Sequence, residues 1–232
     1  VVVICVPTPL DDDLRPDLSA LIGATNSIIP FLQEGMLIIN ESTSYPGTLR
    51  EVIYPIVKEK FQGDINKIFF ASAPERVNPG DKTWGITNTP RLVGGITADA
   101  TDKARDFYQN FCKEVVVTES PEVAEAAKIL ENTFRLVNIA LMHEFNQLLS
   151  AQGIDLNLVV DAASTKPYGF MPFRSGVGIG GHCIPVDPMY LTWWARENGK
   201  ESKLVELADS ISRTMPTYVA NRAWDLIKGN SD

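Results

Sequence analysis

Apolar segments of strand length alternate with helical patterns along the first half of the chain. The opening stretch VVVICV is apolar throughout and rich in β-branched residues, which is typical of a parallel strand covered by helices on both faces. Further strands are expected over 36–43, 67–74, 91–95 and 114–119, with helices over 17–33, 47–60 and 99–112. This alternation predicts a doubly wound α/β fold with a parallel sheet.

The opening strand has a composition suited to the interior of a sheet, so we do not expect it at an edge. The sequence nevertheless starts inside this strand, at Val1, without an initiator methionine. We therefore expect the chain to be an internal fragment whose upstream strands are absent.

The pattern is helical throughout the second half. Ser120 is a suitable N-cap with Pro121 at the first helical position, and apolar residues recur at helical spacing to about residue 151. This helix is too apolar for a surface, so we expect it to cross the centre of the molecule or enter a partner subunit. Further helices are expected over 155–164, 188–198 and 201–227, with an irregular loop over 165–187.

The predicted organisation is a partial Rossmann-like α/β domain over 1–119, followed by an all-α central domain over 120–232. The long apolar helix favours a homodimer.

Composition narrows the class of protein. With 44% hydrophobic and 22% charged residues, the chain is not expected to be disordered. A net charge of -8 argues against nucleic-acid binding, which needs a basic surface to neutralise phosphates. No apolar run is long enough for a membrane span, and the start lacks the features of a signal peptide. We therefore expect a soluble, cytoplasmic protein with a small-molecule partner and no contact with nucleic acid or membrane.

The cysteines and histidines argue against disulfides and metal. Cys5, Cys112 and Cys183 are odd in number and far apart, which favours reduced thiols. With only His143 and His182, and no C-x-x-C pair, zinc would have too few ligands, so no metal is expected.

The segment RSGVGIGGHCIPVDP contains G-x-G-x-x-G at Gly176, Gly178 and Gly181. A dinucleotide fingerprint of this form follows a strand and opens a helix. Here no strand pattern precedes the glycines, and Pro185 and Pro188 interrupt any helix that would start. We therefore do not interpret the pattern as a nucleotide fingerprint.

The same loop places Cys183 directly after closely spaced glycines and four residues before Asp187. A thiol next to a carboxylate and nearly bare backbone is a candidate nucleophile. A structurally buried thiol is the alternative, since free cysteines are often buried. The pattern alone leaves both open.

A second candidate lies on the long helix, in AEAAKILENTF. Lys128 and Asn132 are four residues apart and share a helix face, with Glu125 and Glu131 on flanking faces. A lysine in so apolar a helix can stabilise an oxyanion. The alternative is a surface salt bridge from Lys128 to Glu125 or Glu131.

Two loops follow strands at the carboxyl edge, where ligands bind in such sheets. NESTSYPGT offers Ser42 and Thr43, and SAPERVNPG offers Glu75. Side chains of this kind also serve as helix caps and turn formers, so neither loop is decisive alone.

Taken together, these segments resemble the UDP-glucose/GDP-mannose dehydrogenase family. Members of that family use NAD to oxidise the C6 alcohol of a nucleotide sugar to a carboxylate. The resemblance covers essentially the whole chain, in the family's order: ICVPTP, ESTSYPGT, APERVNPG, RLVGG, AEAAKILENTFR, VNIALMHEFN, TKPYGF and GGHCIPVDP.

The resemblance implies a role for each catalytic candidate. Cys183 resembles the nucleophile that forms a thiohemiacetal and then a thioester. Lys128 and Asn132 resemble the pair that holds the C6 oxygen. Asp187 resembles the carboxylate that handles the alcohol or water proton. Glu75 resembles the group that assists thioester hydrolysis, and Thr43 the residue that positions the water.

The resemblance also implies the binding positions. The strand-end residues that resemble the lining of the NAD site are Val6, Pro7, Thr8 and Thr43. The loop from Arg174 to Gly181 resembles the segment that folds over the sugar nucleotide. The residues expected to bind substrate are Glu75, Arg76, Lys128, Asn132, Arg174, Gly178, Gly180 and Gly181.

Departures from the family pattern bear on the substrate. Val186 stands where the glucose-oxidising branch has lysine, and Pro79 where it has a second glutamate. Both resemble the branch acting on UDP-N-acetylhexosamines, so UDP-N-acetylglucosamine is the expected substrate. Ser175 and Val177 depart from the prolines expected in that branch.

Other interpretations stay open. The family's own G-x-G-x-x-G turn and ribose-binding acid are absent, as is its C-terminal nucleotide-binding domain. Sister specificities for UDP-N-acetylmannosamine, UDP-glucose or GDP-mannose are one alternative, and a non-catalytic fragment or scaffold is another. A cysteine hydrolase pairing Cys183 with His182 is a third, weakened because adjacent residues usually point apart.

Overall fold

The computed structural model describes residues 1–77 and 80–229. The chain divides into two compact units, Val1–Glu131 and Asn132–Asp232. Each unit is described by itself below.

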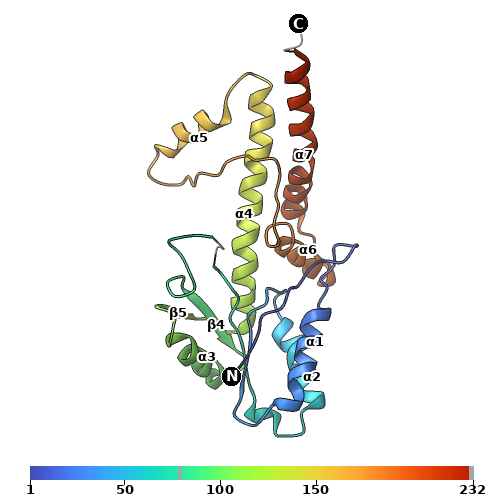
Figure 1. Cartoon of the computed structure of the whole chain (residues 1–232), viewed down its shortest axis with the longest axis vertical. Coiled ribbons are helices and arrows are strands. Elements are labelled where there is room, and N and C mark those ends of the chain that lie inside the picture. Colours follow the sequence, from blue (N-terminus) through green and yellow to red (C-terminus); the bar gives the residue numbers. More distant parts are fainter. Residues whose placement is uncertain (78–79, 230–232) are drawn as a thin grey trace. The chain divides into compact units, whose positions relative to one another are not determined.

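The first unit is an α/β domain built on one sheet (Figure 1). In the described residues the strand order is β1-β2-β3-β4-β5. The strands are β1 (Val2–Ile4), β2 (Leu37–Asn40), β3 (Phe69–Ser72), β4 (Arg91–Gly95) and β5 (Val115–Val117). The helices are α1 (Ser19–Ile28), α2 (Tyr54–Lys60) and α3 (Ala98–Gln109), with a π-helical segment Leu49–Ile53 leading into α2 and 3-10 turns at Ile29–Phe31 and Ile65–Lys67. The predicted strands and helices are thus confirmed, most of them with shorter bounds.

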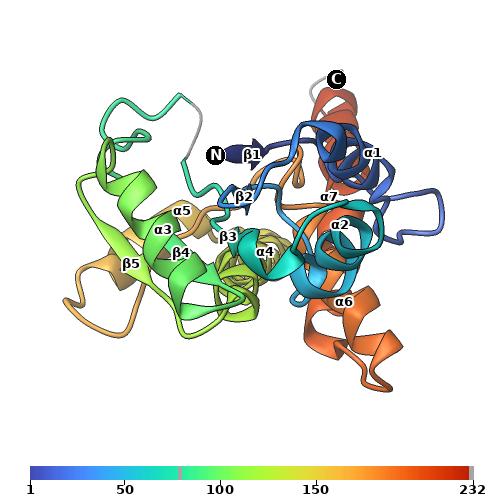
Figure 2. The same cartoon turned by 90° about the horizontal axis from the view of Figure 1, so that it is seen from below.

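Helices cover both faces of the sheet, as a doubly wound fold requires (Figure 2). The pleat of β2 sends Ile38 into a core with Leu21 and Ile53, on the side of α1 and α2. It sends Leu37 and Ile39 into a second core, on the side of α3. The apolar strands of the sequence are therefore buried on two faces.

The sheet corrects the expectation that its strands are all parallel. The pairs β1–β2, β2–β3 and β4–β5 are parallel, but β3–β4 is antiparallel. No helix lies in the described part of the connection from β3 to β4, and a parallel pairing normally needs such a crossover. In the described residues β1 pairs only with β2, so the expectation that the natural protein has further strands beside β1 stays a prediction.

The glycines of β4 allow neighbouring segments to approach its backbone. A Cβ on Gly94 would lie 2.3 Å from the Ser120 carbonyl oxygen, and one on Gly95 would lie 2.4 Å from the Thr101 nitrogen. Ser120 also caps the following helix α4 (Pro121–Ser150), because its Oγ accepts from the Val123 N–H over 3.4 Å. The predicted start of the long helix is confirmed.

The second unit is helical. It contains the later part of α4, with α5 (Leu156–Ser164), α6 (Asp187–Glu197) and α7 (Lys203–Gly229), and the stretch 165–186 is irregular as expected. The α4 and α7 helices run side by side (Figure 1), where Gln147 Nε2 donates to Met215 Sδ over 3.1 Å. The buried residues of α7 recur every three or four positions and so lie on one face of the helix; they are Val205, Ala208, Ser212 and Met215. No helix within residues 1–77 and 80–229 is long and apolar enough to cross a membrane.

Candidate functional site

The loops that follow β1 and β2 are joined at the carboxyl edge of the sheet. The Val6 N–H donates to Ser42 Oγ over 2.9 Å, and the Ser42 hydroxyl donates to the Val6 carbonyl over 2.9 Å. The Thr8 hydroxyl donates to the Thr43 carbonyl over 2.7 Å. The expected cofactor positions Val6, Thr8 and Thr43 are therefore brought together, and Pro7 is exposed on the same loop.

Two buried polar atoms at this edge have no hydrogen-bond partner among the described residues. They are Asn40 Oδ1, at the end of β2, and Ser72 Oγ, at the end of β3. The two residues are paired across the parallel strands. Because buried polar atoms normally have partners, this edge is suited to a polar ligand. Its position at the strand carboxyl ends fits a dinucleotide such as NAD.

Glu75 is held by three donors. Its Oε1 accepts from the N–H groups of Arg76 over 2.6 Å and Val77 over 2.5 Å, and its Oε2 accepts from Arg91 over 2.7 Å. Burial opposes ionisation, but the Val77 N–H and the Arg91 charge outweigh it and lower the pKa of Glu75. A carboxylate with a lowered pKa is a weak base, so this arrangement favours a positioning or electrostatic role.

Arg91 is a component of this edge that our sequence interpretation missed. Its side chain is 4% exposed, and Nη1 donates to the Ala73 carbonyl over 3.1 Å. Its guanidinium also lies 5.0 Å from the Tyr108 ring centre, and Tyr108 donates a hydrogen bond to Glu41. The available signal was the arginine that opens the apolar strand RLVGG, because a buried cation requires partners.

On α4, Lys128 lies one turn before Asn132 and three residues from both Glu125 and Glu131. Glu125 accepts from backbone N–H groups of the loop after β2, and Glu131 pairs with Arg76. In the described residues no ion pair joins Lys128 to either carboxylate. The surface salt bridge considered for Lys128 is therefore not found.

In the second unit, a turn holds Cys183 next to Asp187. The Cys183 carbonyl accepts from the N–H groups of Val186 over 3.1 Å and Asp187 over 2.8 Å, where α6 begins. Asp187 is 4% exposed and accepts a hydrogen bond from the Asn132 amide. The Cys183 thiol is exposed whereas Cys112 is buried, so the alternative of a buried Cys183 is wrong.

The glycine loop is irregular, as predicted, with no strand before it and no helix starting at its glycines. Gly178 has φ +130°, and a Cβ there would lie 3.2 Å from Pro216 Cδ on α7. Gly180 and Gly181 have open space around them. Arg174 is bound to α5, donating to Asn157 over 3.0 Å and to Asp161 over 2.5 Å.

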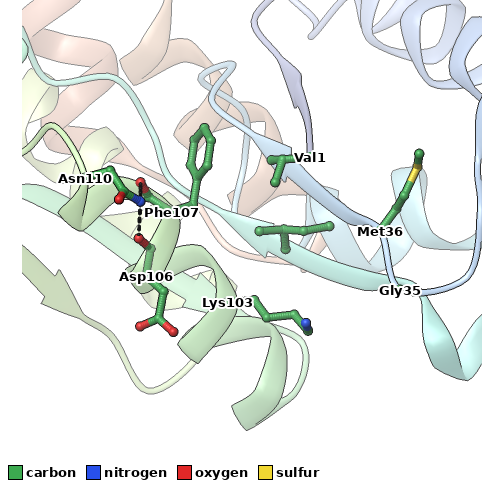
Figure 3. A pocket seen from close by; sticks show the side chains of 8 residues that line it. Val1, Gly35, Met36, Lys103, Asp106, Phe107 and Asn110 are labelled. Carbon is green, nitrogen blue, oxygen red and sulfur yellow. Dashed lines mark hydrogen bonds between the residues drawn. The ribbon is translucent and has the colours of Figure 1, made fainter.

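A pocket of about 230 Å³ lies between this loop and α7, and its lining comprises Leu136, Ile179, Pro185, Asp209, Ser212, Arg213 and Pro216. A larger pocket of about 480 Å³ in the first unit is lined by Lys103, Asp106 and neighbouring residues (Figure 3). That pocket is lined in part by Leu37, at the start of β2, whereas the expected cofactor residue Thr43 follows the end of the same strand. None of the site residues expected from the sequence lines this pocket.

Within the residues that the structure describes, no group of three His, Cys, Asp or Glu side chains is placed to hold a metal ion. All three cysteines are free thiols, as expected.

Comparison with known proteins assigns the chain to a family. Residues 1–112 match the model of the UDP-glucose/GDP-mannose dehydrogenase family, NAD binding domain, and residues 122–214 match that family's central domain. The chain belongs to the UDP-glucose/GDP-mannose dehydrogenase family. The match to the first model identifies its α/β unit as a domain of the NAD-binding type. The expected division at 119/120 falls between the two matches and stays a prediction.

Two relatives illustrate the similarity. The chain is 39% identical over 229 residues to a UDP-N-acetyl-D-glucosamine 6-dehydrogenase of Pseudomonas aeruginosa, which covers 96% of this chain and 53% of that protein. It is 35% identical over 231 residues to a UDP-N-acetyl-D-mannosamine dehydrogenase of Methanocaldococcus jannaschii, which covers 98% and 52%. The chain thus spans about half the length of the curated relatives it matches.

Solved structures agree. A UDP-D-ManNAc dehydrogenase from Pyrococcus horikoshii superposes with a TM-score of 0.87 at 33% identity, covering 98% of this chain and 54% of that one. The named relatives differ in substrate at similar identity, so these comparisons support an NAD-dependent nucleotide-sugar dehydrogenase family without separating the sugars.

Proposed function

We propose that the natural full-length protein carrying this chain oxidises the C6 alcohol of a UDP-N-acetylhexosamine to the carboxylate. The observation that carries the proposal is the turn in which the exposed Cys183 precedes the buried Asp187, itself bound by Asn132. A nucleophile beside a carboxylate and an amide donor matches covalent oxidation of an aldehyde.

The cofactor in this proposal is NAD. When bound, NAD accepts the hydride in each of the two oxidations. Val6, Pro7, Thr8 and Thr43 would hold it at the carboxyl edge of the first unit. The bond from the Thr8 hydroxyl to the Thr43 carbonyl supports this assignment, since it fixes the two loops against each other.

The chain's own residues would handle the sugar. Lys128 and Asn132 would hold the C6 oxygen and stabilise its developing negative charge, and Asp187 would take up the hydroxyl proton as the first hydride leaves C6 and the aldehyde forms. The Cys183 sulfur then adds to the aldehyde carbon to form a thiohemiacetal, whose oxidation gives a thioester. Water cleaves the C–S bond, releasing the acid and restoring the thiol.

The water step falls to the first unit. Thr43 would position the water, and Glu75 would assist its attack on the thioester. The three donors around Glu75 support electrostatic and positioning assistance better than proton removal, because its pKa is lowered.

For the substrate, UDP-N-acetylglucosamine is our first choice. The relative that is 39% identical over 229 residues and carries that sugar in its name supports it. Arg76, Arg174 and the glycines at 178, 180 and 181 would contact the sugar nucleotide. Val186 favours the N-acetylhexosamine branch, while the similar argument from Pro79 lies outside the described residues. UDP-N-acetylmannosamine is the main alternative.

The test uses the natural full-length protein and counts NADH formed per sugar consumed. We expect two NADH per UDP-N-acetylglucosamine with wild type, and no acid with Cys183→Ser. Cys5→Ser is the matched control, because Cys5 is also an exposed thiol. Acid production by Cys183→Ser at the wild-type rate would refute the mechanism. A preference for UDP-N-acetylmannosamine, UDP-glucose or GDP-mannose in the same assay would change only the substrate.

We also propose that the protein is a homodimer formed through α4. Phe134, Leu141, Phe145 and Leu148 are exposed and share one face of that helix. A continuous exposed apolar stripe is characteristic of an interface between subunits. We expect wild type to sediment as a dimer and Leu141→Glu as a monomer. A monomeric wild type would contradict this assignment and leave the catalytic proposal untouched.

A further inference from the structure

The first turns of α4 are attached to the strand-end loops at two points, one on each side of Lys128. Glu125 lies three residues before Lys128, and Glu131 lies three residues after it. Each is an acidic side chain at a spacing that, when the acid is ionised, normally allows an ion pair with a lysine on the same helix. Each is bound elsewhere instead.

Glu125 binds the loop that follows β2. Its Oε2 accepts from the Gly47 N–H over 2.7 Å and its Oε1 from the Leu49 N–H over 3.2 Å. The residue is only 2% exposed. Both donors are backbone groups at the start of the helical segment that leads into α2, where N–H groups without an intrahelical partner need a hydrogen-bond acceptor. This contact fixes α4 against the loop that carries Thr43.

Glu131 binds the loop that follows β3. Arg76 donates to it through Nε over 3.2 Å and through Nη2 over 2.6 Å, a two-point contact that restricts both side chains. Arg76 is also anchored by the Pro90 carbonyl, which accepts from Nη1 over 2.8 Å. This second contact fixes α4 against the loop that carries Glu75.

The two contacts leave the Lys128 ammonium without a carboxylate partner in the described residues. If Arg76 were removed, Glu131 would be released at a spacing that suits pairing with Lys128. A paired ammonium is partly neutralised and is a poorer donor to a developing oxyanion.

We propose that Glu125 and Glu131 are positioning residues that fix the start of α4 and, by binding the strand-end loops, keep Lys128 available to the substrate oxygen. The inference rests on the proposed function, which assigns Lys128 to that oxygen. It also gives Arg76 a task in addition to the proposed contact with the sugar nucleotide, namely holding Glu131 away from Lys128.

A mutant cycle in the natural full-length protein separates these roles by kcat and KM. We expect Arg76→Ala to lower kcat about 10-fold, less than the roughly 100-fold or greater loss typical when an oxyanion donor is removed. The double variant Arg76→Ala/Glu131→Gln lacks the freed carboxylate, so kcat should recover to within about 3-fold of wild type. Arg105→Ala is the control, since Arg105 pairs with Asp102 and Asp106 on an exposed surface of α3.

A double variant as slow as Arg76→Ala, or an Arg76→Ala variant with wild-type kcat, would overturn the inference. An Arg76→Ala variant that raises the KM for sugar nucleotide without lowering kcat would leave Arg76 with its substrate contact alone, and would equally overturn the inference. The variant Lys128→Met distinguishes failure of the proposed role of Lys128 from failure of the inference about Glu125 and Glu131. If that variant keeps full activity, the proposed role of Lys128 fails; if it loses activity but the cycle shows no recovery, only this inference fails.

Discussion

Glu75, in the loop after β3, and Cys183, in the turn before α6, are proposed to act in the same reaction. Their surroundings differ, because the Glu75 side chain is held by hydrogen bonds and Cys183 is exposed. Glu75 accepts three hydrogen bonds, one of them from the buried Arg91. The Cys183 backbone carbonyl accepts the hydrogen bonds that shape its turn, and Cys183 is exposed.

The difference follows from the chemistry of the two groups. A carboxylate is costly to bury unless donors surround it, and those donors also fix its orientation. A thiol that must form and break a covalent bond needs access, and fixed partners would obstruct it. Substitutions in the network around Glu75 should therefore mainly lower the unfolding free energy, whereas substitution of Cys183 should mainly lower the catalytic rate.

Removing Arg91 should break the network most severely. Arg91→Met leaves Glu75 and Glu41 without their shared cation, and the Ala73 carbonyl without its donor. Because the Glu75 side chain is 40% exposed and water replaces part of the lost interaction, we expect the unfolding free energy to fall by about 1–3 kcal/mol. Urea unfolding measures the effect, with Arg105→Met as a surface control expected to change stability by less than about 0.5 kcal/mol. Equal stability of Arg91→Met and wild type would show that the network is not structural.

A second carboxylate sharpens the comparison through its pH dependence. Burial raises the pKa of Glu125 to about 8, opposed by the Gly47 and Leu49 N–H groups, and Glu122 and Glu51 raise it further. A raised pKa means that the folded state binds more protons than the unfolded state, so this contribution to stability is lost as pH rises from about 4.5 to about 8.

Glu125→Gln should therefore flatten that decline. The unfolding free energies of wild type and Glu125→Gln should be measured from pH 5 to pH 9. We expect the two curves to converge or cross at the alkaline end, instead of running parallel. Parallel curves would mean that Glu125 is ionised across the range, as Glu75 is expected to be from its lowered pKa.

The smallest effect concerns the second unit. Ser212 is 3% exposed, and its Oγ lacks a hydrogen-bond partner in the part of the chain that the structure describes. Ser212→Ala removes an unsatisfied hydroxyl, so thermal or urea unfolding should show a change within about 0.5 kcal/mol or a modest gain. A loss of more than about 1 kcal/mol would indicate that the hydroxyl has a partner in solution, such as an ordered water in the adjoining pocket.

Much of the fold could be predicted from the sequence because its segments carry strong local patterns. The strand 91–95 and the helix from Pro121 were placed at or near their observed limits. The antiparallel direction of β4 could not be predicted, since strand direction is decided by contacts distant in sequence. Composition records how a strand is usually buried, not which neighbours it has.

The candidate site divides in the same way. Cys183, Asp187 and Asn132 stand in recognisable segments, and the structure brings them together within one unit. The bonds of Glu125 to Gly47 and of Glu131 to Arg76 join residues more than 50 positions apart, so no local pattern reveals them. This limits what the sequence says about Lys128. It shows that Glu125 and Glu131 are spaced to pair with Lys128, but not that each of them binds another residue.

The most direct test of the central claim is to detect the covalent intermediate on Cys183. The natural full-length protein would be mixed with UDP-N-acetylglucosamine and NAD, quenched in acid, digested and analysed by mass spectrometry. We predict a sugar-nucleotide adduct on the peptide that contains Cys183, and an unmodified peptide around Cys5, the other exposed thiol. Turnover to the acid with no adduct on Cys183 under any quench time, or with an adduct on Cys5 instead, would contradict the account.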